Sequence, residues 1–123
     1  MNAILIYIGG AMSILWGLTH LFPTKNVVKG FGKITLDNKR IITMEWIVEG
    51  VALIFTGLIV ISVTVVDIAS NVSETVYWLS IVELIVLAIV SLFTGLKVNF
   101  IPYKLCPFIF TASAILILLG LLL

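Results

Sequence analysis

The chain contains few charged residues, one cysteine and one histidine. Seven Lys or Arg and six Asp or Glu make up 11% of its 123 residues. The lone Cys106 excludes an internal disulfide, a CxxC couple and a cysteine-rich metal site. A net charge of +1 gives no field that would attract nucleic acid, so no such partner is expected. One histidine without a ligand motif predicts no metal site, and no motif indicates a cofactor.

Apolar residues make up 62% of the chain. Soluble domains are nearer about half apolar and about a quarter charged. A chain this short cannot bury so much apolar surface in one core, because small domains bury only a modest fraction of their surface. The composition therefore predicts an integral membrane protein whose surface lies in lipid. The apolar N-terminal stretch has no basic n-region or cleavage site, so we expect it to be a retained span.

Four apolar stretches stand out, at about residues 3–22, 41–66, 76–96 and 101–123. Each reaches the roughly 20 residues that a helix needs to cross ~30 Å of hydrocarbon. Only helices and closed barrels cross lipid, and no strand-like alternation is present. We therefore predict an all-α fold, an integral membrane four-helix bundle that forms a single transmembrane domain over residues 1–123.

All basic residues fall in two of the predicted connections. Five lie in the loop 23–40 and two lie at the turn where the third span ends and the fourth begins: Lys25, Lys29, Lys33, Lys39, Arg40, Lys97 and Lys104. The positive-inside rule places both connections in the cytoplasm and both termini on the outer side. We expect a multi-pass protein of the plasma membrane, in a bacterial inner membrane. Within the loop, Thr24 is expected to cap a short turn ending at Gly30, and Asp37 or Asn38 to cap the second span.

Small residues are expected to mediate packing between the spans. Gly9, Ser13 and Gly17 follow one another at four-residue spacing in the first span, and Gly50 and Gly57 lie two turns apart in the second. Helices in lipid associate through close backbone approach at such residues. These positions predict the faces on which the helices meet.

Three carboxylates lie within the predicted spans. They are Glu45 and Glu49 in the second span and Glu83 in the third. Ionisable groups at membrane depth are costly, so they indicate a functional site by default. Glu45 and Glu49 are four residues apart and share a helix face. His20, at the cytoplasmic end of the first span, lies on the face that carries Ser13, Trp16 and Gly17.

We expect His20 and Glu45 to lie at similar depth on adjacent helices and to form a hydrogen bond. Asn38 and Arg40 are expected to close the mouth of the same pocket, with Arg40 as another partner for Glu45. Trp16 and Trp46 lie about a turn inside the boundary and are either interfacial anchors or cavity walls.

These residues allow three functional hypotheses. The preferred one is a polar intramembrane pocket near the cytoplasmic end that binds or acts on a lipophilic small molecule by proton transfer. In it, Glu45, Glu49 and His20 are the catalytic candidates, and Trp16, Asn38, Arg40, Trp46 and Glu83 are the ligand-binding candidates. The second is a proton-coupled transporter, which would need to act as a homodimer to form a path. The third is an accessory subunit of a membrane complex, so whether the chain is an enzyme stays open.

A structural interpretation competes with each of these assignments. Glu45, near a boundary, would then extend to the interface or pair with Arg40, and His20 would be an interfacial polar residue. Glu49 and Glu83 are expected to lie deeper in the membrane, where a structural role accounts less well for a carboxylate.

Four compact spans, a glycine-rich first helix and the run Trp16-Gly17-Leu18-Thr19-His20 followed by Pro23 resemble the DoxX-like small bacterial membrane proteins. The resemblance implies a four-helix membrane fold. Some members of that group are associated with quinone-linked oxidoreductase complexes. No catalytic residues are carried over from it.

Overall fold

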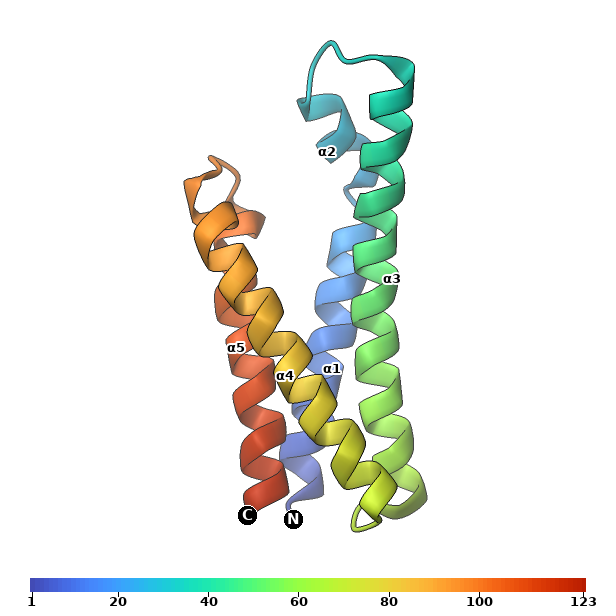
Figure 1. Ribbon diagram of the computed structural model, residues 1–123, viewed down its shortest axis with the longest axis vertical. Helices are drawn as coiled ribbons and strands as arrows, with labels where there is room; N and C mark the ends of the chain where they lie inside the picture. The colour runs from blue at the N-terminus through green and yellow to red at the C-terminus, as the bar shows by residue number, and fades with distance from the viewer.

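The computed structural model describes all 123 residues, and every regular element is a helix (Figure 1). In chain order the elements are α1 (Ala3–Leu21), α2 (Thr24–Gly30), α3 (Leu36–Asp67), α4 (Asn71–Thr94), the 3₁₀ turn η1 (Gly95–Lys97) and α5 (Ile101–Leu122). Four of them, α1, α3, α4 extended by η1, and α5, are long and apolar enough to cross a membrane. The prediction of an all-α chain with four apolar helices is confirmed.

The four long helices lie in the order α3, α1, α5, α4, with α1 packed between α3 and α5. Helix α4 packs along α5 and adjoins α3 mainly near their connecting loop, from which the two diverge (Figure 1). Both termini lie at one end of the molecule, here called the termini end. The other end carries α2, the α4–α5 connection and all seven Lys and Arg residues, and is called the basic end.

Glycines allow the backbones of α1 and α3 to touch. A Cβ atom on Gly17 would lie 2.6 Å from the carbonyl oxygen of Gly50, and one on Gly57 would overlap the carbonyl oxygen of Gly10. Neither site admits a side chain without a backbone shift, and such close approach drives association in lipid. The predicted role of Gly17, Gly50 and Gly57 in packing is confirmed.

Buried serines add hydrogen bonds at these contacts. Ser13 Oγ on α1 donates to the carbonyl oxygen of Leu53 on α3 at 2.8 Å. Ser113 Oγ on α5 donates to the carbonyl oxygen of Gly9 at 2.7 Å. Central helix α1 is therefore joined by close packing and a buried hydrogen bond to each neighbour.

Helices α3 and α4 each start five residues earlier than the apolar stretches indicated, at Leu36 and Asn71 rather than at residues 41 and 76. Helix α3 begins at Leu36 because Thr35 caps it, its side chain accepting from the backbone N–H of Asn38 at 3.2 Å. The expected caps, Asp37 and Asn38, are therefore wrong, since both lie inside the helix. Ser70 likewise caps α4 by accepting from the N–H of Ser73. A prediction based on apolar runs misses the first turn of a helix when the residues of that turn are polar.

The loop 23–40 contains the expected short turn, as helix α2. Thr24 does not cap it, since its hydroxyl donates to the carbonyl oxygen of Leu21 at 2.6 Å and Pro23 occupies the cap position.

Helix α3 is longer than a membrane span requires. At about 1.5 Å per residue, its 32 residues span about 48 Å, well beyond the ~30 Å of hydrocarbon. The start of α3 therefore extends past the end of α1 at the basic end (Figure 1).

Candidate functional site

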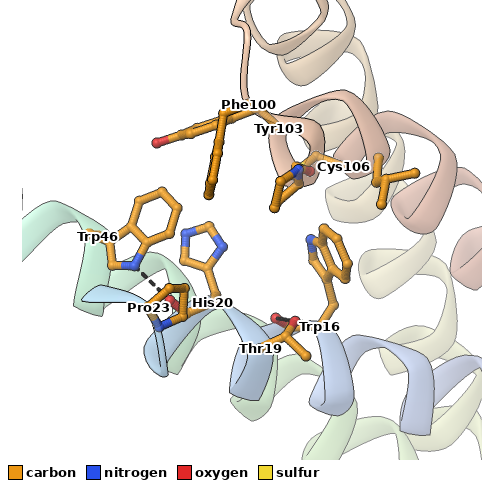
Figure 2. Close-up of a pocket in the computed structure, with 10 residues that line it drawn as sticks. Trp16, Thr19, His20, Pro23, Trp46, Phe100, Tyr103 and Cys106 are labelled. Atoms are coloured by element: carbon orange, nitrogen blue, oxygen red, sulfur yellow. Dashed lines mark hydrogen bonds between the residues drawn. The ribbon is translucent and has the colours of Figure 1, made fainter. Parts of the chain in front are cut away.

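A cavity of about 150 Å³ lies at the basic end, where α1, α3 and the start of α5 meet. Ten residues line it: Trp16, Thr19, His20, Pro23, Trp46, Phe100, Pro102, Tyr103, Leu105 and Cys106. Figure 2 shows the His20 ring between Trp46 and Trp16, with Phe100 and Tyr103 on the side of α5. Six of the ten residues are hydrophobic, so the space favours a largely apolar occupant with a few polar contacts.

His20 is held rigidly in the wall of this cavity. It follows Trp16 by one helical turn, so both side chains leave α1 on the same face. The His20 ring stacks on Trp46 with centroids 3.8 Å apart and planes 15° from parallel. The Trp46 Nε1–H donates to the His20 carbonyl oxygen at 2.6 Å, which fixes the indole under the imidazole. His20 is therefore a buried, positioned side chain, 6% exposed, and Trp46 is a cavity wall.

Glu49 is the carboxylate that reaches the histidine. Its Oε2 atom lies 3.2 Å from His20 Nε2, while its side chain stays 43% exposed. The two groups are close enough for an ion pair, although Nε2 is not aligned on the carboxylate as a hydrogen bond. At this distance a carboxylate stabilises positive charge on the imidazole.

The predicted His20–Glu45 bond is wrong. Trp46, Glu49 and Gly50 lie on the side of α3 that meets α1, and one residue corresponds to about 100° of rotation around a helix. Glu45 precedes Trp46, so it turns away from α1 and is exposed. Glu45 and Glu49 are four residues apart on α3, so both side chains line a second hollow.

That second hollow is an open groove of about 330 Å³ on the outer side of α3. Glu45 and Glu49 both line it, together with Trp46 and Tyr103. The Tyr103 ring meets Trp46 edge-on with centroids 5.5 Å apart, so these two rings separate the groove from the cavity. The Glu49–His20 contact is therefore a polar link from the open groove to the cavity.

Trp16 supplies a hydrogen-bond donor without a partner. Its Nε1 atom is buried and makes no hydrogen bond of good geometry, and the only acceptor beside it is the Cys106 sulfur, which is a weak one. In Figure 2 this nitrogen is on the side of the indole nearer His20. A buried donor left unpaired costs about 1–3 kcal/mol, a cost that a ligand carrying an acceptor would remove.

Asn38 and Arg40 do not close the cavity. Both are exposed in the first turns of α3, which extend past α1, and neither lines the cavity. Arg40 Nη1 lies 3.9 Å from Asp37 Oδ1, three residues earlier, so its expected pairing with Glu45 is wrong. The prediction failed because α3 begins five residues earlier than expected, at Leu36 rather than residue 41.

Glu83 lies outside this site, in a different groove between α3 and α4. The chain contains no group of three or more His, Cys, Asp or Glu side chains that could hold a metal ion. Of the three glutamates in the spans, only Glu49 contacts His20.

Sequence reasoning missed Phe100, Tyr103 and Cys106 as cavity residues. All three come from the α4–α5 connection or the first turns of α5, far from His20 in sequence. The available signal was two aromatic residues around Pro102 beside a basic turn, which is typical of an interfacial segment. No pattern indicated that this segment would lie against the end of α1.

No protein family, curated protein or solved structure matches this chain.

Proposed function

We propose that this chain is a multi-pass membrane protein whose basic end faces the cytoplasm and whose cavity there binds a lipophilic small molecule and exchanges a proton with it. The observation that carries the proposal is the His20–Glu49 pair, with His20 in the cavity wall and Glu49 in the open groove. The orientation is supported by all seven basic residues lying at one end, as the positive-inside rule requires of a cytoplasmic face.

The size and walls of the cavity favour a single flat ring. An apolar protein cavity of about 150 Å³ holds a molecule the size of benzene. Here the volume is similar, and the rings of Trp16, His20 and Phe100 offer flat faces for stacking. The unpaired Trp16 Nε1–H favours a ring that carries a hydrogen-bond acceptor.

His20 is the proton acceptor in this proposal. A ligand hydroxyl in the cavity transfers its proton to the imidazole, and the nearby Glu49 carboxylate stabilises the imidazolium. Glu49, being partly exposed, then exchanges the proton with the groove that it shares with Glu45. His20 is thus the group that takes the proton from the ligand. Glu49 stabilises the protonated His20, and Glu45 has a secondary role in the groove.

The DoxX-like resemblance is part of the same proposal. Trp16, Thr19, His20 and Pro23, which carry the resemblance, all line the cavity. The resemblance therefore supports a pocket in common with the DoxX-like proteins rather than a reaction in common with them.

The test uses 4-nitrophenol, a single-ring phenol whose phenolate form has its own visible absorption band. With the protein in lipid nanodiscs, we expect the ratio of phenolate to phenol for the bound probe to rise about tenfold over empty nanodiscs at the same pH, equivalent to ~1.4 kcal/mol. His20→Gln should abolish the rise and Glu49→Gln should reduce it, since each removes part of the proton acceptor.

Asp67→Asn is the matched control, because it removes a carboxylate from the same helix at the opposite end. It should leave the band unchanged. The proposal is wrong if wild-type protein does not bind the probe, or if His20→Gln retains the full phenolate band.

A further inference from the structure

A second polar site lies near the middle of the long helices, in a groove of about 440 Å³ between α3 and α4. Its polar residues are Thr56, Ser80 and Glu83, and Phe55, Ile59 and Leu79 are among its apolar walls. The groove exists because α3 and α4 diverge from their connecting loop toward the basic end (Figure 1). It is separate from the cavity that contains His20.

Glu83 has no cationic partner in the chain. The only ion pairs are His20 with Glu49 and Arg40 with Asp37. The next basic residue after Glu83 is Lys97, in η1 beyond the end of α4, about 21 Å away at ~1.5 Å per residue. An ionised carboxylate at this depth costs several kcal/mol unless it is paired, and the fold supplies no cation to pair with Glu83.

Thr56 satisfies the carboxylate only in part. Its hydroxyl lies 3.0 and 3.2 Å from the two Glu83 oxygens, and 3.0 Å from the carbonyl oxygen of Ala52. One hydroxyl has one proton, so it donates to a single acceptor at a time. An ionised carboxylate accepts about four hydrogen bonds, and most of this capacity in Glu83 is unused.

We propose that this groove binds a lipophilic ammonium, whose charged nitrogen pairs with Glu83 and whose apolar body lies against the aliphatic walls between α3 and α4. Charge complementarity decides the occupant, because the site presents one unpaired acid in apolar surroundings. This site is independent of the proton transfer proposed at the basic end.

A second copy of the chain fits the groove less well. All seven Lys and Arg residues lie at the basic end, so a parallel copy brings no positive charge to the depth of Glu83. Such a contact would leave the acid unpaired or place it against its own counterpart, and like charges repel.

The test measures binding of 1-adamantylammonium to the protein in nanodiscs, with 1-adamantanol as a neutral probe of the same shape. Wild-type protein should bind the ammonium at least tenfold more tightly than the alcohol. Glu83→Gln should remove this preference, and Glu83→Asp, which keeps the charge, should retain most of it. Comparing the two variants separates loss of charge from loss of fold.

Glu74→Gln, an exposed position on the same helix, and Glu49→Gln, in the other site, should both leave the preference intact. The proposal is overturned if the alcohol binds as tightly as the ammonium, or if Glu49→Gln rather than Glu83→Gln removes the preference. It is also overturned if cross-linking shows the groove occupied by a second copy.

Discussion

The two sides of α3 are built differently, although both are apolar. Toward α1, glycines bring the backbones into contact, and Ser13 adds a buried hydrogen bond. Toward α4, Thr56 meets Glu83, and the helices diverge around a groove. Toward α1, small residues keep the helices in contact. Toward α4, contact is kept near the connecting loop, where Thr64 meets Tyr77, and an opening remains around Thr56 and Glu83. Both proposed sites occupy such openings.

The cavity at the basic end is the other opening. His20 and Trp46 are large side chains about one turn beyond the last glycine contact between α1 and α3, which joins Gly17 and Gly50, and Trp16 directly precedes Gly17. Their bulk holds the start of α5 away from α1, and the space between becomes the cavity. The contrast between closed and open contacts therefore predicts how substitutions on each side should act.

The largest effect is expected on the closed side, for Gly57→Ala. The added Cβ would overlap the Gly10 carbonyl oxygen, so the backbones of α1 and α3 must separate. Overpacking of this kind typically costs about 1–3 kcal/mol. Unfolding in mixed micelles with increasing denaturing detergent would measure it. Gly30→Ala is the control, since a Cβ there meets nothing within 4 Å, and equal stability of both variants would contradict the close contact.

A smaller difference is expected between Ser13→Ala and Thr56→Val. Ser13→Ala removes an interhelical hydrogen bond that is fully buried, and such bonds in membrane proteins contribute about 0.6 kcal/mol on average and up to ~1.7 kcal/mol. Thr56→Val removes a hydroxyl that three acceptors share, the Ala52 carbonyl oxygen and both Glu83 oxygens. It should therefore cost less than Ser13→Ala, below about 0.6 kcal/mol by the same assay. A larger loss for Thr56→Val would mean that α3 and α4 depend on this contact to stay together.

Much of the fold could be predicted from the sequence. The four long helices follow from four apolar runs, and the basic end follows from the clustering of seven Lys and Arg residues along the chain. The glycine contacts were also predictable, since spacing along a helix fixes which residues share a face. The start of α3 was not, because its first turn is polar and Thr35 caps it from outside the apolar run.

The candidate site was predicted only in part. His20, Glu49, Trp16 and Trp46 were identified from their positions on two helices. The partner of His20 was assigned to Glu45 because depth was counted from the end of the apolar run, whereas rotation around α3 decides which glutamate faces α1. Phe100, Tyr103 and Cys106 come from a third segment, and their approach to His20 depends on tertiary packing that no local pattern encodes.

Cys106 provides the most direct test of the cavity as the ligand site. It is the only cysteine, it is 6% exposed, and it lines the cavity with His20. The measurement is the rate at which methyl methanethiolsulfonate modifies this thiol in nanodiscs, with and without saturating 4-nitrophenol. As a control, the Cys106→Ser, Thr111→Cys variant carries its thiol on the exposed side of the same helix.

We predict that the probe slows modification of Cys106 at least tenfold and leaves the thiol at position 111 unaffected, because a ring in the cavity blocks access only to Cys106. An unchanged rate at Cys106 under saturating probe would show that the ring binds elsewhere, and would contradict the assignment of the cavity beside His20 and Glu49 as the functional site.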